Sequence, residues 1–240
     1  MKRIDTILFD LDGTLLPMEQ GTFINTYLVL LAEYVSTMGH DAKPFIKALW
    51  EGTGAMLAND GTMHNRERFW ETFCKLYGID ATALEEELSI FYTTRFNEML
   101  ALVLPKPPLR PLLDHLRSKG YGITLATNPV FPKVAVHARL NWIGLSPKDF
   151  DHITTYENSR YCKPQTGYFQ DILSRLCKEP DQCLMIGNSP AEDMAAAKLG
   201  ISVFLLTDHL DNVKDLPLEG YPQGGFAQME ALLRGLPQLA

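Results

Sequence analysis

Apolar residues follow two different spacings along the chain, and the first covers about residues 20 to 100. There they recur every three or four positions, which places their side chains on one face of an α-helix. Four such stripes follow one another without a strand between them, and they begin at Phe23, Phe45, Phe69 and Leu84. Successive amphipathic helices cover their apolar faces against each other, so this stretch predicts a small all-α bundle.

Two local signals concern details of this bundle. Thr82 and Glu85 are three positions apart, the spacing of a capping box, and they predict the start of the fourth helix. A glycine-bearing turn precedes the third helix and carries Asn59 and His64. Such a turn either contacts a substrate or is solvated, and its polar composition favours a solvated loop.

The rest of the chain alternates short apolar runs with helical spacing. The expected strands lie at 4–9, 122–127, 152–155, 183–187 and 202–206. The expected helices lie at about 109–118, 132–142, 166–177, 190–199 and 226–234. Strands that alternate with helices form a parallel sheet covered on both faces, which defines an α/β fold. The first strand needs partners in that sheet, so the helical bundle is an insertion after it.

A proline-rich connection supports this division. Four prolines fall between positions 105 and 111, and they make a stiff boundary after the bundle. We therefore expect an α/β domain formed by residues 1–17 plus 105–240, and a helical domain formed by residues 18–104.

The charge balance narrows the classes of partner. The chain has 240 residues, with 22 Lys and Arg against 29 Asp and Glu, a formal charge of −7. An acidic surface repels a phosphate backbone, so nucleic acid is not an expected partner, although a basic pocket for one phosphate is compatible with it. No apolar run approaches the roughly 18 residues that cross a bilayer, and Asp5, Asp10 and Asp12 interrupt the N-terminal run. We expect a cytoplasmic protein without a membrane segment.

Polar side chains follow the expected strands, where ligands bind in open α/β sheets. They are Asp10, Asp12 and Thr14 after the first strand, Thr127 and Asn128 after the second, Lys163 beyond the third, and Asn188, Glu192 and Asp193 after the fourth. Carboxylate oxygens bind divalent metals, and a lysine with hydroxyl and amide donors binds phosphate. These strand ends therefore predict one site for a metal and a phosphate.

The same residues resemble the four motifs of the haloacid dehalogenase superfamily. Residues 10–14 (Asp-Leu-Asp-Gly-Thr) resemble the first motif, and Thr127 at the end of an apolar strand resembles the second. Lys163-Pro164 resembles the third motif, and residues 187–193 resemble the fourth. Their order and approximate spacing agree along the whole chain. The resemblance implies a Rossmann-like catalytic core with the helical insertion as a cap domain.

The resemblance also implies a reaction and roles for these residues. It implies a Mg²⁺-dependent phosphohydrolase that acts on a small phosphorylated metabolite, as a monomer or a homodimer. Asp10 would attack phosphorus and form an aspartyl-phosphate, and Asp12 would serve as general acid and then as general base. Thr127, Asn128 and Lys163 would hold the phosphate of the ester. Dehalogenation is disfavoured, because dehalogenases of the superfamily lack the second aspartate.

The implied metal site departs from the family pattern at one position. Its ligands would be the Asp10 carboxylate, the Asp12 backbone carbonyl, Asn188 and Asp193. Mg²⁺ suits such a site, because it takes few carboxylates together with waters and substrate phosphate. Asn188 stands where the family usually has an acid, so the site carries less negative charge. Glu192 would substitute if the following helix began one residue differently.

Two other classes of function fit part of the pattern. A phosphomutase or phosphonate hydrolase of this superfamily uses an extra lysine or histidine of the cap, for which Lys43, Lys47 and His64 are candidates. A non-catalytic binding protein could keep the fold, and the neutral Asn188 favours it. The intact first and third motifs favour an enzyme over such a protein.

Overall fold

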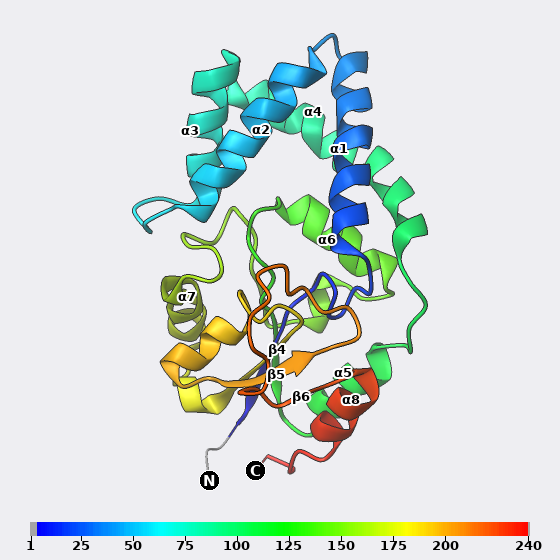
Figure 1. Ribbon diagram of the computed structural model, residues 1–240, viewed down its shortest axis with the longest axis vertical. Coiled ribbons are helices and arrows are strands. Elements are labelled where there is room, and N and C mark those ends of the chain that lie inside the picture. Colours follow the sequence, from blue (N-terminus) through cyan, green and yellow to red (C-terminus); the bar gives the residue numbers. More distant parts are fainter. Residues whose placement is uncertain (1–3, 240) are drawn as a thin grey trace.

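The structure is a computed structural model that describes residues 4–239, and it has two parts (Figure 1). One part is a sheet flanked by helices, and the helices α1 to α4 lie above it in the figure. These four helices come from the chain between β1 (Thr6–Phe9) and β2 (Gly122–Leu125). The predicted α/β fold with an all-α insertion is confirmed, whereas the division into domains at 17/18 and 104/105 stays a prediction. Within residues 4–239, no helix has the length and apolarity needed to cross a membrane.

The sheet contains six parallel strands in the order β3-β2-β1-β4-β5-β6. The other four strands are β3 (His152–Ile153), β4 (Cys183–Gly187), β5 (Ser202–Leu206) and β6 (Gln223–Gly224). Every β1 side chain is buried, as expected for a strand covered on both faces. Phe9, the last residue of β1, pairs with Leu125 of β2 and Ile186 of β4. This register brings the segments after all three strands to the same edge of the sheet.

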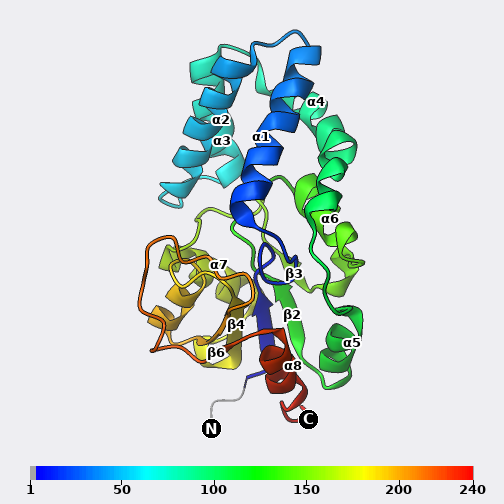
Figure 2. The same cartoon turned by 45° about the vertical axis from the view of Figure 1, so that its right-hand side comes forward.

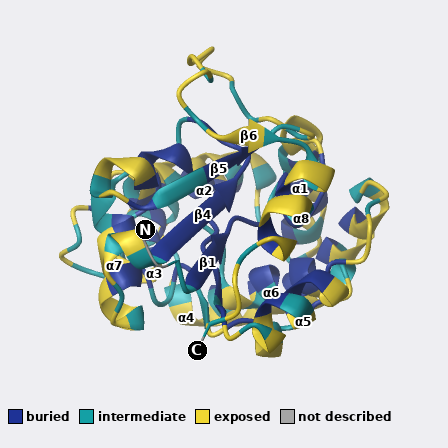
Figure 3. Ribbon diagram, turned by 90° about the horizontal axis from the view of Figure 1, so that it is seen from below, coloured by how far each residue is buried: buried dark blue, intermediate teal, exposed yellow. Residues whose placement is uncertain are grey.

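Helices cover both faces of the sheet (Figures 2 and 3). α5 (Arg110–Ser118) and α8 (Phe226–Arg234) share a core with Phe9 on one face. α7 (Thr166–Leu176) shares a core with Leu8 on the other face. Neighbouring residues of β1 therefore serve opposite cores, because successive side chains of a strand point to opposite faces. Figure 3 shows the central strands buried and the outer helix surfaces exposed.

The insertion consists of four α-helices and one 3₁₀-helix. These are α1 (Gln20–Thr37), α2 (Ala42–Leu57), α3 (Asn65–Tyr77), α4 (Ala81–Thr93) and η1 (Arg95–Leu102). The first residues of the four predicted stripes are all buried. The fourth stripe is interrupted, because the chain leaves the α-helix at Thr94 before η1 begins.

The predicted capping box of α4 is wrong. Asp80 caps this helix, and its side chain accepts a hydrogen bond from the Thr82 amide at 2.7 Å. Glu85 binds Arg66 of α3 instead, with Arg66 Nε donating to Glu85 Oε1 at 2.8 Å. Glu85 therefore forms an ion pair between two helices and not a cap.

Two elements of the core also differ from the expectation. The helix expected at 190–199 is reduced to the 3₁₀-helix η4 (Met194–Leu199). The segment before it turns tightly, because Asp193 Oδ2 accepts a hydrogen bond from the Ser189 amide at 2.9 Å. β6 was not predicted, since two residues that include a glycine give no apolar run.

The turn before α3 docks on the core. Asn59 and Asn65 are both buried, and Asn59 Nδ2 donates to Asn65 Oδ1 at 2.8 Å. Asn65 Nδ2 donates to the Pro129 carbonyl at 3.2 Å, and the Asn65 amide donates to the Ser159 carbonyl at 2.8 Å. The prediction of a solvated loop is therefore wrong at Asn59, because Asn59 is buried and bonds to Asn65, which in turn bonds to the core backbone.

Gly52 of α2 allows close contact with Phe69 of α3. A β-carbon at Gly52 would lie 2.7 Å from the Phe69 ring. We expect Gly52→Ala to lower the free energy of unfolding by about 1–3 kcal/mol, the usual cost of overpacking a core. Gly54→Ala in the same helix meets nothing within 4 Å, and it should raise stability by about 0.5–1 kcal/mol. Urea denaturation of both variants measures this, and equal stabilities would contradict the proposed contact.

Candidate active site

Three charged side chains from separate strand ends meet at one edge of the sheet. Lys163 Nζ lies 2.8 Å from Asp10 Oδ1 and 2.6 Å from Asp193 Oδ1. The Lys163 side chain is fully buried, and the Asp10 and Asp193 side chains are 10% and 2% exposed. A buried ammonium group between two carboxylates is stable because charge-assisted hydrogen bonds compensate its lost hydration. The structure thus brings together three of the residues that the sequence predicts for the site.

The sheet positions Asp10. It follows β1 directly, and its amide donates to the Ile186 carbonyl of β4 at 2.9 Å. Its second carboxylate oxygen, Oδ2, accepts a hydrogen bond from the Thr14 hydroxyl at 3.2 Å. Hydrogen bonds from Lys163 and Thr14, one to each carboxylate oxygen, therefore fix the orientation of the Asp10 side chain.

Burial shifts the pKa values of the cluster in opposite directions for the lysine and the aspartate. Burial by itself lowers the pKa of Lys163, but the carboxylates of Asp10 and Asp193 outweigh it and hold this pKa well above its ordinary value. Burial raises the pKa of Asp193, although Lys163 opposes the shift. Lys163 thus stays protonated at neutral pH and can neutralise an anion beside Asp10.

Asp12 has a partner that sequence reasoning missed. Its carboxylate forms an ion pair with Arg139 of α6 (Lys133–Trp142), and the Arg139 side chain is fully buried. The Arg139 guanidinium also lies over the Phe131 ring, 4.5 Å from its centroid. Burial raises the pKa of Asp12, while Arg139 opposes this shift. A raised pKa suits a carboxyl group that must donate a proton near neutral pH.

The sequence did hold a signal for Arg139. It stands in an apolar stripe of α6 with Ala135, Val136 and Leu140, all of them buried. A charged residue at a stripe position needs a buried counter-ion, because an unpaired charge is costly inside a protein. Asp12 Oδ1 and Arg139 Nη2 are buried and have no hydrogen-bond partner among the described residues.

The other two expected phosphate-binding residues, Thr127 and Asn128, lie beside this cluster. Asn128 Oδ1 accepts a hydrogen bond from the Lys163 amide at 3.2 Å, and Asn128 Nδ2 donates to Glu192 Oε2 at 3.1 Å. Thr127 is buried, and its carbonyl accepts hydrogen bonds from Thr154 Oγ1 at 2.7 Å and Tyr168 Oη at 2.9 Å. The backbone of the second motif is thus fixed next to Lys163.

Oxygen atoms suitable for a metal converge on the other side of Asp10. The Thr14 hydroxyl bonds to Asp10 Oδ2 and also to Asn188 Oδ1, at 3.3 Å. Asn188 Nδ2 donates to the His209 carbonyl at 2.6 Å, which turns the amide oxygen of Asn188 toward Asp10. Gly13 makes room for this amide, because a β-carbon there would lie 2.1 Å from Asn188 Nδ2.

The remaining acids of the fourth motif have other contacts. Both Asp193 oxygens accept hydrogen bonds, one from Lys163 and one from the Ser189 amide, so its ligation of a metal stays a prediction. Glu192 lines the space under the cap and bonds to Asn128. No three His, Cys, Asp or Glu side chains of residues 4–239 form a metal-binding cluster. Carboxylate and amide oxygens with a backbone carbonyl still fit Mg²⁺, which keeps several waters.

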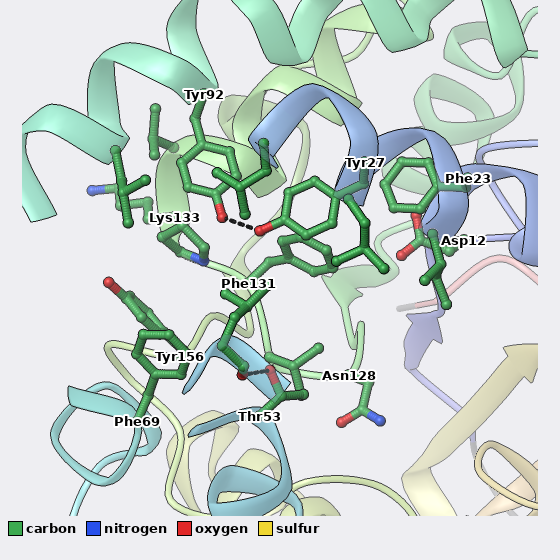
Figure 4. A pocket seen from close by; sticks show the side chains of 18 of the residues that line it. Asp12, Phe23, Tyr27, Thr53, Phe69, Tyr92, Asn128, Phe131, Lys133 and Tyr156 are labelled. Carbon is green, nitrogen blue, oxygen red and sulfur yellow. Dashed lines mark hydrogen bonds between the residues drawn. The ribbon is translucent and has the colours of Figure 1, made fainter. Parts of the chain in front are cut away.

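A cavity of about 790 Å³ separates the cap from this edge of the sheet (Figure 4). Asp12, Asn128 and Glu192 line it from the core, and helices α1 to α4 line it from the cap. The cavity therefore extends from residues next to the charged cluster, such as Asn128, to the surface of the bundle. Pockets of this size typically hold small organic ligands.

Comparison with known proteins agrees with this arrangement. Residues 4–200 match the family model of haloacid dehalogenase-like hydrolases. The chain therefore belongs to the haloacid dehalogenase-like hydrolase family, and the resemblance seen in its four motifs is confirmed. It is a hydrolase of the phosphatase-like kind, as its relatives indicate.

Two curated relatives and one solved structure illustrate the relationship. The chain is 27% identical over 199 residues to pyrophosphatase PpaX of Bacillus velezensis, across 83% of this chain and 81% of that protein. It is 25% identical over 201 residues to phosphoglycolate phosphatase of Rhodospirillum rubrum, across 84% and 78%. The crystal structure of a HAD phosphatase from Thermococcus onnurineus shares the fold, with a TM-score of 0.61, 22% identity, and 98% and 100% coverage.

The Lys163 cluster makes a prediction about stability. Lys163→Met leaves the carboxylates of Asp10 and Asp193 buried without a counter-ion, and it should cost about 3–5 kcal/mol of unfolding free energy. Adding Asp193→Asn removes one of these charges, so the double variant should be more stable than Lys163→Met alone. Urea denaturation of the two variants and the parent protein tests both statements. A Lys163→Met protein as stable as the parent would contradict the cluster.

Proposed function

We propose that the protein is a Mg²⁺-dependent phosphohydrolase that cleaves a small phosphate monoester through an aspartyl-phosphate on Asp10. The observation that carries this proposal is the position of Asp10, held by Lys163 and Thr14 at the strand edge with Asp12 two residues away. A nucleophile and a permanent cation then lie beside a carboxyl group of raised pKa, Asp12, which lines the cavity. Family membership supports the same chemistry.

In the first step an oxygen of the Asp10 carboxylate attacks phosphorus, and the bond from phosphorus to the ester oxygen breaks. The protonated Asp12 carboxyl donates its proton to that leaving oxygen, so an alcohol departs. Lys163 stabilises the negative charge on the transferring phosphoryl group, and Thr127 and Asn128 orient it. The products are the alcohol and an acyl phosphate on Asp10.

In the second step a water molecule attacks the same phosphorus. Asp12, now ionised, accepts a proton from this water. The bond between phosphorus and the Asp10 oxygen breaks, which releases inorganic phosphate and restores the carboxylate. Arg139 keeps Asp12 in place through both steps, because it donates a hydrogen bond to the protonated carboxyl and forms an ion pair with the carboxylate.

Asp10, Asn188 and the Asp12 carbonyl would hold the Mg²⁺, with Asp193 as the further ligand that the family pattern implies. The convergence of Asp10 Oδ2 and Asn188 Oδ1 on one hydroxyl supports this choice of ligands. When bound, the ion supplies positive charge that offsets the phosphoryl oxygens. Asn188 brings no charge of its own, so we expect weaker binding of the metal than an acid at this position would give.

The geometry favours hydrolysis over the mutase-like alternative. Lys43 and Lys47 are exposed, and neither they nor His64 line the cavity. A phosphomutase or phosphonate hydrolase would need such a lysine or histidine of the cap positioned over the site. The cap residues that do line the cavity are mainly apolar.

The nucleophile can be tested directly. Asp10→Asn should lower kcat for an aryl phosphate at least about 1000-fold, because the amide is a poor nucleophile. Asp114→Asn, an exposed change on α5, is the matched control and should keep the parent rate. EDTA should abolish turnover by the parent protein, and added Mg²⁺ should restore it. Ordinary turnover by Asp10→Asn, with circular dichroism showing an intact fold, would rule out Asp10 as the nucleophile.

A further inference from the structure

The cavity under the cap is built mainly from rings. Phe23, Tyr27, Phe69, Tyr92, Phe131 and Tyr156 line it (Figure 4). Leu31, Leu49 and Leu88 add aliphatic surface from three different cap helices. A surface of this composition gains free energy by covering apolar groups of a ligand. The phosphate itself needs only the strand edge, so this space is available for the rest of a substrate.

The tyrosine hydroxyls of the rings are already satisfied, whereas Trp70 Nε1 of the lining has no hydrogen-bond partner among the described residues. The hydroxyls of Tyr27 and Tyr92 hydrogen-bond to each other at 2.8 Å, as Figure 4 shows. Tyr156 Oη donates to Glu85 Oε1 at 2.5 Å. Burial raises the pKa of Tyr27, so this pair stays neutral. The cavity therefore offers few unpaired donors to a polar ligand.

The charged residues of the lining disfavour a second negative charge on the substrate. Five carboxylates line the cavity, those of Asp12, Glu85, Glu86, Glu157 and Glu192. Asp12 is paired with Arg139 and Glu85 with Arg66, so the repulsion comes mainly from the other three. Among the described residues of the lining, Lys133 is the sole lysine or arginine, and it is exposed. Glu157 accepts a hydrogen bond from the Lys133 backbone amide at 2.8 Å, so a carboxylate lies next to the backbone of this residue.

One wall of the cavity presents apolar side chains that are partly exposed to solvent. Trp50 and Leu57 of α2 belong to the lining, and they are 49% and 44% exposed. Large apolar side chains that stay partly exposed at a pocket mark a place where a ligand covers them. Asp12 lies at one side of this space in Figure 4, and Phe69 and Tyr156 lie at the opposite side.

We infer that the substrate is the phosphate monoester of a bulky, ring-bearing alcohol that carries no second negative charge. This inference rests on the proposed function and adds the substrate class to it. The phosphate lies against Lys163 and Asn128, and the apolar leaving group fills the space between the aromatic rings of cap and core. Pyrophosphate and phosphoglycolate, for which the two relatives are named, each carry further negative charge and lack the apolar group.

A matched series of alcohol phosphates tests the substrate class. We would compare kcat/KM for ethyl phosphate, benzyl phosphate and naphthylmethyl phosphate, whose leaving groups differ mainly in apolar size. The expected gain from ethyl to naphthylmethyl is about 10- to 100-fold, the range that burial of an aromatic group gives. A carboxylated naphthylmethyl phosphate and phosphoglycolate should both be poorer substrates than naphthylmethyl phosphate. Equal values along the series, or a preference for phosphoglycolate, would overturn the inference.

A variant that fills the cavity links the preference to this space. Thr53 of α2 lines the cavity, and Thr53→Phe should reduce the ratio of naphthylmethyl to ethyl phosphate hydrolysis at least about tenfold. Glu51→Phe on the same helix is exposed and outside the lining, and it should leave this ratio unchanged. An unchanged ratio in Thr53→Phe would place the apolar preference elsewhere and contradict the inference.

Binding separates this inference from the proposed reaction. Calorimetry would compare the binding of naphthylmethylphosphonate with that of ethylphosphonate to the parent protein in Mg²⁺. In both compounds a P–C bond replaces the P–O bond that hydrolysis of an ester would break. Tighter binding of the naphthyl compound, lost in Thr53→Phe, supports the cavity assignment even if no ester is hydrolysed. Asp10-dependent hydrolysis of every ester with equal binding of the two phosphonates would keep the proposed function and overturn the substrate class.

Discussion

The Lys163 ammonium group is buried between the carboxylates of Asp10 and Asp193, and the arrangement of the site depends on these contacts. A charge without water around it is stable only while its partners stay within hydrogen-bond distance. The three residues follow different strands, so the ion pairs fix the relative positions of three loops at the sheet edge. The same contacts orient the nucleophile and keep a cation where a phosphoryl group would carry its charge.

A second buried ion pair connects this edge to the cap. Asp12 pairs with Arg139, and Arg139 lies over Phe131, which also lines the cavity. Phe96 of η1 packs near Phe131 and against Trp142 at the end of α6. The helix α6 and the residues just before it therefore contact Asp12, form part of the cavity wall and pack against η1 of the cap. A substrate that displaced these rings would also change the surroundings of Asp12.

Much of the fold was predictable because its signals are local. The strands at 183–187 and 202–206 and the helix at 226–234 have the predicted limits, since apolar runs and helical stripes define them. The meeting of Asp10 with Lys163 followed from topology and from the family motifs. The pairing of Asp12 with Arg139, the hydrogen bond of Asn59 to Asn65, and the ion pair of Glu85 with Arg66 depend on tertiary packing. No spacing along the chain encodes which distant residue lies opposite, so these contacts required the structure.

The central claim is that phosphate leaves through a covalent intermediate on Asp10. The stereochemical course at phosphorus tests it most directly, because it does not require the intermediate to accumulate. A phosphorothioate monoester made chiral with oxygen isotopes would be hydrolysed in isotopically labelled water. Two successive in-line displacements, by Asp10 and then by water, predict retention of configuration. Inversion would show a single direct attack by water and would contradict the account.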